Sequence, residues 1–126
     1  MDVPADLLYT TDHEWIQRVA TGIRIGITDY AQDALGDVVY VQVPTVGTTV
    51  AAGDSFSEVE STKSVSDIYA PVAGVVVEVN ESLGDDPSVV NSDPYGQGWL
   101  CVIEPASAEE VDALMDALAY RALTEG

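Results

Sequence analysis

Lys63 is the residue of this chain with the most distinctive potential chemistry, because it is the only lysine among 126 residues. It lies in the stretch Glu-Ser-Thr-Lys-Ser-Val-Ser-Asp (60–67), whose small polar residues favour an exposed turn between strands. The other three bases, Arg18, Arg24 and Arg121, are all arginines. An arginine cannot replace a lysine where a neutral amine must form an amide or a Schiff base. Lys63 is therefore the candidate working residue, and a surface lysine that survived by chance is the alternative.

Other catalytic and metal-binding patterns are absent from the sequence. His13 is the only histidine and Cys101 the only cysteine, whereas a zinc site needs three or four such ligands. No Gly-x-Ser-x-Gly turn, calcium-loop spacing or phosphate-binding glycine pattern occurs. We expect His13 to be structural or to line a cleft, and Cys101 to pack as a small apolar residue in the core.

The charge of the chain is strongly negative, with 22 Asp and Glu against 4 Lys and Arg and a formal net charge of −18. Such a surface disfavours nucleic acid, which is bound through clustered basic residues, and it disfavours anionic membranes. Few of the acids can find a basic partner. Because salt screens the repulsion among the rest, we expect a halophilic protein that works in a salt-rich cytosol. An acidic protein that is steered towards basic partners is the alternative.

Length and composition indicate one domain over residues 1–126. The start Met-Asp-Val-Pro-Ala-Asp has neither the basic nor the apolar segment of a signal peptide. No apolar stretch approaches the roughly 20 residues that a membrane helix needs. A lone cysteine also suits a reducing compartment. We therefore expect a cytoplasmic protein.

The elements that must position Lys63 are predicted to be mainly short β-strands separated by glycine and proline. Alternating or β-branched stretches of this kind cover residues 15–19, 23–27, 38–43, 48–50, 56–60, 65–70, 75–80 and 99–104. Similar units, each a strand followed by a Gly-Asp turn, flank Lys63 on both sides. This weak symmetry would place Lys63 at a turn near the junction of two halves.

Two helices are expected. One lies near 28–35, where Thr28 is a cap and Gly36 a stop signal. The other lies near 107–119 and starts at a Ser107 capping box. Its apolar residues recur at helical spacing and predict a stripe that packs on the β-core; they are Val111, Leu114, Met115 and Leu118.

Several segments, taken together in this order and spacing, resemble the H protein of the glycine cleavage system. The matching residues run along nearly the whole chain and are His13-Glu14-Trp15, Gly26-Ile27-Thr28, Tyr30-Ala31-Gln32, 35–39, 44–47, 58–74, Val79-Asn80, Pro87, Val90-Asn91 and 94–99. The resemblance implies a mainly β fold, a flattened barrel or sandwich of two interlocked sheets related to lipoyl and biotinyl domains. It also implies that the carrier lysine lies on a hairpin tip.

The resemblance further implies that lipoic acid is attached to Lys63 and that the chain is a carrier, not an enzyme. The carrier would shuttle the aminomethyl group of glycine in glycine catabolism and one-carbon metabolism. Its partners would be a pyridoxal-phosphate glycine decarboxylase, a folate-dependent aminomethyltransferase, a dihydrolipoyl dehydrogenase and a lipoylating enzyme. By the same resemblance, Glu60 and Gly74 fall where the lipoylating enzymes of related carriers need an acid and a glycine.

The same resemblance implies a cleft into which the loaded arm folds, beside the His-Glu-Trp segment. Glu14 and Asp67 are the residues it nominates to hold the protonated amine by charge-assisted hydrogen bonds. Two ordinary surface acids are the alternative. Asp12 replaces the small hydroxyl residue associated with that position.

Other functions remain open from the sequence. An H-like protein that relays lipoyl groups to other complexes would have the same fold. A biotin carrier is disfavoured because the Met-Lys-Met tip typical of that chemistry is absent. An enzyme that uses Lys63 as a Schiff-base amine would need a buried lysine with a lowered pKa. An unmodified acidic binding module would carry no group on Lys63 at all.

Overall fold

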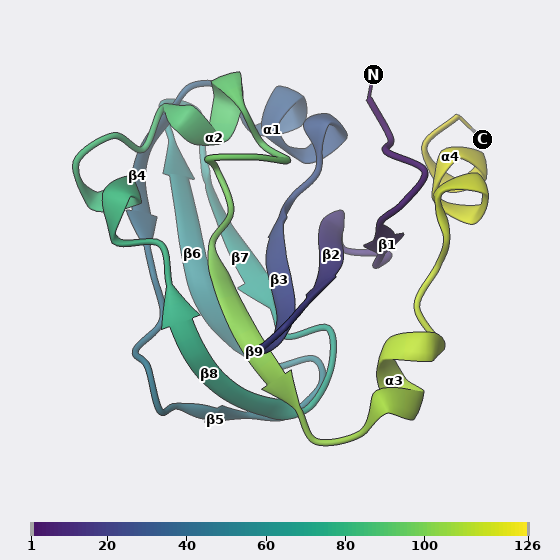
Figure 1. The fold of residues 1–126 in the computed structure, drawn as a ribbon. Coiled ribbons are helices and arrows are strands. Elements are labelled where there is room, and N and C mark those ends of the chain that lie inside the picture. Colours follow the sequence, from purple (N-terminus) through teal and green to yellow (C-terminus); the bar gives the residue numbers. More distant parts are fainter. Residues whose placement is uncertain (1, 126) are drawn as a thin grey trace.

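The computed structural model describes residues 2–125, which form two antiparallel sheets with short helices around them (Figure 1). The six-stranded sheet has the order β1-β2-β3-β9-β8-β5. Its strands are β1 (Leu8–Tyr9), β2 (Glu14–Val19), β3 (Gly22–Ile27), β5 (Thr49–Val50), β8 (Gly74–Val79) and β9 (Cys101–Pro105). The three-stranded sheet has the order β4 (Val38–Gln42), β6 (Ser55–Ser61), β7 (Val65–Tyr69). The predicted two-sheet fold is confirmed, although the sheets do not close into a barrel.

The helices are short. They are α1 (Asp29–Leu35), the 3-10 helix η1 (Glu81–Gly84), α2 (Val89–Ser92), α3 (Ala108–Asp112) and α4 (Ala117–Glu125). In Figure 1, α1 and α2 lie together at one end of the sheets, and α4 lies at the side, next to the N-terminal segment. Within residues 2–125, no helix has the length and apolar character needed to span a bilayer.

Helix α1 begins and ends as the sequence predicts. The Thr28 hydroxyl caps its first turn by accepting a hydrogen bond from the backbone N–H of Ala31 at 3.2 Å. Gly36 ends the helix with a φ of 85°, in the left-handed region that glycine adopts without steric cost. The chain can therefore turn sharply from α1 into β4.

The predicted single helix over 107–119 is wrong, because the structure contains two helices there. The Ser107 hydroxyl caps α3 as expected, accepting from the Glu109 N–H at 3.3 Å, but α3 ends at Asp112. The backbone of Met115 then leaves the helical path and exchanges two hydrogen bonds with Tyr9 at 2.8 and 3.0 Å. This pairing satisfies polar groups at the edge of β1, and the Asp116 carboxylate accepts from the Ala119 N–H at the start of α4.

The break changes which apolar residues of the C-terminal region are buried. Val111 packs in the core, and Leu114 and Met115 pack against it while partly exposed. Leu118, which was expected to complete the stripe, is 78% exposed. A continuous helix would have kept all four side chains on one face, and the change of direction at Met115 turns Leu118 towards solvent.

Three clusters of buried apolar side chains hold these elements together. The first is centred on the six-stranded sheet and includes Ile16, Ile25, Val76, Cys101 and Ile103. The second joins α1 and α2 to the three-stranded sheet and includes Leu35, Val41, Val59, Ile68 and Val90. The third fixes the N-terminal segment and α4 and includes Val3, Leu7, Tyr9, Trp15 and Tyr120. Burial raises the pKa of the Cys101 thiol to about 12, so this cysteine is a protonated core residue as expected.

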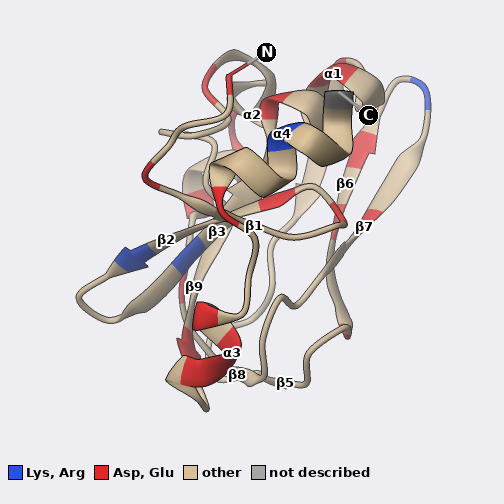
Figure 2. Cartoon of the chain, turned by 90° about the vertical axis from the view of Figure 1, so that its right-hand side faces the viewer, with Lys and Arg blue, Asp and Glu red and all other residues tan. Residues whose placement is uncertain are grey.

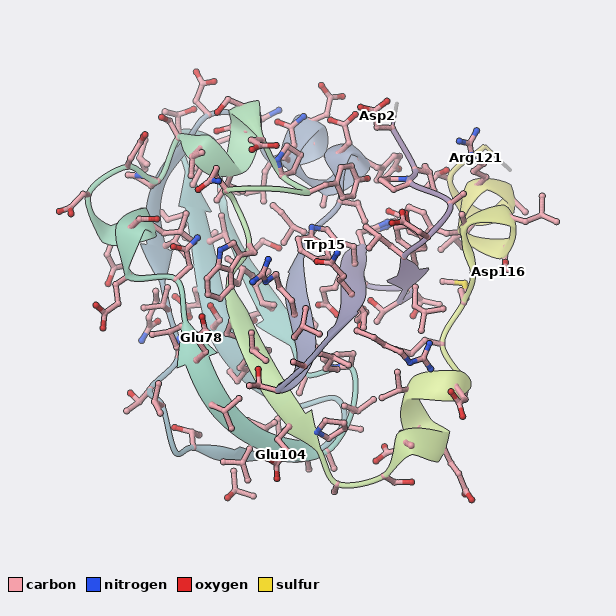
Figure 3. The ribbon with its side chains drawn as sticks, viewed as in Figure 1. Asp2, Trp15, Glu78, Glu104, Asp116 and Arg121 are labelled. Atoms are coloured by element: carbon pink, nitrogen blue, oxygen red, sulfur yellow. The ribbon has the colours of Figure 1, made fainter. Side chains whose placement is uncertain are left out.

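Acidic positions are spread over many parts of the chain, and basic positions are few (Figure 2). Three of the acids labelled in Figure 3, Glu78, Glu104 and Asp116, are exposed. Within residues 2–125, the one ion pair joins Arg18 to Asp112, and both side chains are more than half exposed. The other two arginines contact uncharged groups. Arg24 lies 4.7 Å from the centre of a ring of Trp99, and Arg121 donates a hydrogen bond to the Val3 carbonyl oxygen.

Candidate functional site

Lys63 lies at the tip of the hairpin that β6 and β7 form, and it is exposed as the sequence predicts. Figure 2 shows one blue segment at the outer end of that hairpin, whereas the other blue segments lie on β2, β3 and α4. An exposed amine at this place does not fit the buried, desolvated lysine of a Schiff-base enzyme.

A buried serine fixes the conformation of the tip. The Ser61 hydroxyl accepts hydrogen bonds from the backbone N–H groups of Lys63 and Ser64, each at 3.1 Å, and donates to the Ser64 carbonyl oxygen at 3.1 Å. The Ser61 N–H also donates to the Ser64 carbonyl oxygen at 2.8 Å. On the other side, the Thr62 N–H donates to the carbonyl oxygen of Asp37 at 3.0 Å. The backbone on both sides of Lys63 is therefore held in place.

The connection from α1 to β4 packs against the tip. Its Gly36 lies against the Lys63 side chain, and a Cβ at Gly36 would be 3.1 Å from the Lys63 Cε. The Asn91 side chain fixes this connection, since its amide donates to the Gly36 carbonyl oxygen at 2.9 Å and to the Gln32 side chain at 3.0 Å. Its oxygen accepts from the Val38 N–H at 2.8 Å. Elements distant in the sequence thus form one base for the lysine.

The outer face of the three-stranded sheet begins directly beside the tip. Tyr40, Glu60 and Val65 form one row across β4, β6 and β7, and Tyr40 and Val65 are 53% and 54% exposed. In the next row, Glu58 pairs with Asp67. We call these five residues the outer face; they combine apolar side chains with three carboxylates and lie close to Lys63.

A cleft of about 280 Å³ lies on the other side of β7, between this strand and α1. We call it the α1 cleft. Its lining residues are Asp12, His13, Ile27, Tyr30, Ala31, Ala34, Leu35, Ser64, Val65, Ser66 and Ile68. The lining combines Ser64, which is next to Lys63, with apolar residues and with the polar groups of Asp12 and His13. A long apolar arm with a polar end could therefore lie in it.

His13 lines the α1 cleft, which confirms one of the two roles expected for it. Its backbone has a φ of 66°, a left-handed conformation that is uncommon for residues with a side chain. The ring stacks on Tyr30 with 4.7 Å between centroids, and its Nδ1 is 2.7 Å from the Tyr120 hydroxyl. Partial burial lowers the pKa of His13, which favours the neutral ring.

Glu14 is fully buried, so it is not an ordinary surface acid. One carboxylate oxygen accepts from the Thr10 hydroxyl at 2.9 Å, and the other accepts from the Tyr69 N–H at 3.0 Å. Burial raises the pKa of Glu14 to about 7, although these two hydrogen bonds oppose the shift. Glu14 borders a second cavity of about 310 Å³, whose lining includes Thr10, Gly53 and Met115.

The structure does not bring Glu14 and Asp67 into one cavity. Asp67 is exposed on the outer face and lines neither of the two cavities, whereas Glu14 lines the second cavity only. Asp12 is the acid that borders both. The sequence could not place these residues, because the side that each strand residue faces depends on the pairing between strands.

Gly74 lies buried at the start of β8, in the six-stranded sheet and not in the sheet that carries the tip. A Cβ there would be 2.2 Å from the Glu104 carbonyl oxygen on β9. The close approach of the two backbones therefore requires a glycine at this position. Among residues 2–125, no three His, Cys, Asp or Glu side chains are grouped as metal ligands.

Comparisons with known proteins agree with this geometry. The family model described as glycine cleavage H-protein matches residues 7–126. A glycine cleavage system H protein from Anaeromyxobacter sp. (strain K) is 53% identical over 125 residues, covering 99% of this chain and 98% of the relative. One from Mycobacterium tuberculosis (strain H37Rv) is 57% identical, with 98% of each chain covered.

A solved structure shares the fold as well as the sequence. It is the crystal structure of a glycine cleavage system H protein from Mycobacterium marinum, with a TM-score of 0.88 and 48% sequence identity. The alignment covers 98% of this chain and 100% of the solved chain. The likeness therefore extends over both sheets and the helices.

The raised pKa of Glu14 predicts an effect of pH on stability. The pKa of Glu14 is about 7 in the folded protein, against an ordinary value of 4.5. Between pH 4.5 and pH 7, the folded protein therefore keeps a proton on Glu14 that the unfolded chain has lost. The contribution of Glu14 to the free energy of unfolding is thus fully present below pH 4.5 and is lost as pH rises through 7. We expect Glu14→Gln, which cannot ionise, to gain stability relative to the wild type between pH 5 and pH 8, by up to about 3 kcal/mol. Urea unfolding of both proteins measures this, and a difference that does not change with pH would contradict the shift.

Proposed function

Because this chain belongs to the glycine cleavage H-protein family, we propose that lipoic acid is attached through an amide bond to Lys63. The protein is the lipoyl carrier of the glycine cleavage system and a carrier component, not a catalyst. The related proteins do not favour a role in relaying lipoyl groups to other complexes. The observation that carries the assignment is the single lysine of the chain, exposed on a hydrogen-bonded hairpin tip.

The residues around Lys63 fit a tethered lipoyl group. The amine extends from a tip whose backbone is held by Ser61, so a modifying enzyme meets a defined conformation. The α1 cleft opens beside the same tip and offers an apolar surface. A lipoyl group on Lys63 would supply a disulfide, which can accept a one-carbon unit and two electrons when glycine loses its carboxylate as carbon dioxide. The chain itself supplies attachment, orientation and shelter.

The carrier interacts with the other components of the glycine cleavage system. We propose that these are a pyridoxal-phosphate glycine decarboxylase, a folate-dependent aminomethyltransferase and a dihydrolipoyl dehydrogenase. A tether on Lys63 makes each transfer effectively intramolecular once a partner has docked, which raises the local concentration of the arm. Neither a metal nor a catalytic side chain of the carrier is needed for that role.

We propose that the lipoylating enzyme recognises this protein by binding to the outer face. Before modification, that enzyme must reach the short Lys63 side chain itself, so it must contact the residues directly beside the tip. Glu60 lies in the first row, between Tyr40 and Val65, and can accept charge-assisted hydrogen bonds. Gly74 is buried against β9, so the lipoylating enzyme would not contact it directly. A glycine at this position would instead support lipoylation by allowing β8 and β9 to pair closely.

We propose that the loaded arm folds into the α1 cleft, where acids stabilise its protonated amine. Asp12 borders the cleft and lies near Glu14, as its effect on the Glu14 pKa indicates. Glu14 would influence the amine indirectly, because it lines the second cavity together with Asp12. Asp67 follows the cleft residue Ser66 on β7 and would act at the rim, where a long arm can pass over the edge of the sheet.

We also propose that the protein is halophilic and works in a salt-rich cytoplasm. The chain carries 22 acids and 4 bases, and its arginines make only one ion pair among residues 2–125. Most of the carboxylates therefore repel one another across the surface. The distance over which charges interact falls from about 10 Å at 0.1 M salt to about 3 Å at 1 M. Dissolved salt should thus stabilise the folded state.

The attachment site is tested by lipoylating the purified chain with a lipoate–protein ligase, lipoic acid and ATP. Intact mass spectrometry should show one lipoyl group on the wild type and none on Lys63→Arg, because a guanidinium keeps the charge but forms no such amide. Peptide mapping should place the group on residue 63. Modification of the Lys63→Arg variant, or a wild type that remains unmodified, would disprove the assignment.

The recognition role of Glu60 is tested with a matched pair of charge-removing variants on the same face of β6. We expect Glu60→Gln to lower kcat/KM for lipoylation by about tenfold, the loss of one charge-assisted hydrogen bond. Glu58→Gln removes the same charge one row further from Lys63 and should change kcat/KM less than twofold. Equal losses for the two variants would mean that the enzyme responds to overall charge alone.

The salt requirement is tested by thermal unfolding in dilute buffer and in 1 M KCl. We expect Tm to rise by about 4 °C or more, the effect of roughly 1 kcal/mol on a chain of this length. The double variant Glu81→Gln, Asp85→Asn removes two exposed acids on and beside η1 and should gain less from salt than the wild type. A Tm that is the same in both buffers would end the halophile proposal.

A further inference from the structure

His13 is held in a conformation that its own backbone does not favour. A φ of 66° is adopted by few residues with a Cβ, and such strain persists only where surrounding contacts enforce it. Two backbone hydrogen bonds fix the segment, from His13 to the Thr10 carbonyl oxygen and from Thr28 to the His13 carbonyl oxygen. Strained residues of this kind cluster at functional sites, and His13 is part of the wall of the α1 cleft.

The His13 ring is positioned by a residue that lies 107 positions away in the chain. Tyr120 on α4 is fully buried, and its hydroxyl is 2.7 Å from the His13 Nδ1. The same hydroxyl is 2.7 Å from the Thr28 hydroxyl, which caps α1. One phenol oxygen therefore joins α4 to the residue that directly precedes β2 and to the cap of α1.

The protons of this network can be assigned from its donors and acceptors. The Thr28 oxygen already accepts from the Ala31 N–H, so its own proton is available for Tyr120. Tyr120 can then donate to the His13 Nδ1, and every hydroxyl proton is used. This arrangement requires a neutral His13 ring with its proton on Nε2.

We propose that Tyr120 is a positioning residue, whose hydroxyl holds the His13 ring in place as a wall of the α1 cleft. The C-terminal helix α4 thereby sets how well the loaded Lys63 arm is sheltered from water. The inference rests on the proposed function, because the arm must be carried on Lys63 and folded into this cleft. Tyr120 would not itself contact the arm, since it acts through His13.

The chain offers a matched pair of tyrosines for the test. Tyr9 is as fully buried as Tyr120, and the two rings stack with centroids 4.6 Å apart. The Tyr9 hydroxyl, however, donates to the Pro4 carbonyl oxygen at 2.6 Å and has no part in the His13 contact. Tyr120→Phe and Tyr9→Phe each remove one buried hydroxyl and keep the ring, so a general loss of stability should affect both alike.

The first measurement is the lifetime of the aminomethyl-loaded, lipoylated full-length protein in buffer, after removal of the enzymes that loaded it. We expect Tyr120→Phe to shorten the lifetime about threefold to tenfold, as the loss of one or two buried hydrogen bonds implies. Tyr9→Phe should remain within twofold of the wild type, and both variants should have similar Tm values. A Tyr120→Phe lifetime equal to that of the wild type, or equal losses in both variants, would overturn the proposal.

The second measurement needs no cofactor and separates this inference from the proposed function. His13 is the only histidine, so the 15N NMR signals of its two ring nitrogens report its tautomer without overlap from another histidine. We expect the Nε2–H tautomer in the wild type and in Tyr9→Phe, and a mixture of tautomers in Tyr120→Phe. An unchanged tautomer in Tyr120→Phe would refute the positioning role even if Lys63 is lipoylated.

A double-mutant cycle links the two measurements. His13→Asn removes the ring, and asparagine tolerates the left-handed backbone conformation better than most residues. If Tyr120 acts through His13, adding Tyr120→Phe to His13→Asn should shorten the loaded lifetime no further. Fully additive losses would show that Tyr120 affects the arm by another route and would contradict the proposal.

Discussion

The placement of Lys63 depends on one buried hydroxyl group. Ser61 uses its single side-chain oxygen to hold the backbone of Lys63 and Ser64, which closes the hairpin within three residues. A longer or looser turn would let the lysine sample many positions, and each docking event would then have to order it at an entropic cost. The contact between Thr62 and Asp37 extends the same restraint to β4. A carrier with no catalytic groups contributes mainly by this kind of preorganisation.

The α1 cleft explains why the tip is built against a helix and not left free. Helix α1 ends at Gly36, directly under the Lys63 side chain, and Asn91 binds this junction from α2. The second cluster of buried side chains packs beneath these elements, so the cleft wall and the hairpin share one packed core. An arm anchored at the tip can therefore alternate between solvent and the cleft while the protein itself keeps its shape. Asp12 and His13 supply polar groups to the cleft, and a charged end of such an arm would lie beside them.

Local signals in the sequence predicted the parts of the fold that local contacts determine. The Thr28 cap and the Gly36 stop defined α1, and the small polar residues around Lys63 indicated its turn. Features set by distant contacts could not be predicted. Met115 leaves the helical path because Tyr9 offers backbone partners across more than a hundred residues. Glu14 is buried because β2 pairs in a register that turns its side chain inward, and the Tyr120 contact with His13 exists only once α4 is folded over β1.

The distribution of charge gives the tip a further physical distinction. The three arginines are engaged with Asp112, the Trp99 ring and the Val3 carbonyl oxygen, all away from the hairpin. Lys63 is thus the only positive side chain near the carboxylates of the outer face.

Amidation of a lysine removes its charge, so a modified tip and its surroundings would be uniformly negative. Because opposite charges accelerate encounter and like charges suppress it, partners of the modified form would need basic surfaces around their active sites, and two such carriers would repel one another. A strongly acidic shell is therefore compatible with a carrier that must reach several enzymes in turn without associating with itself.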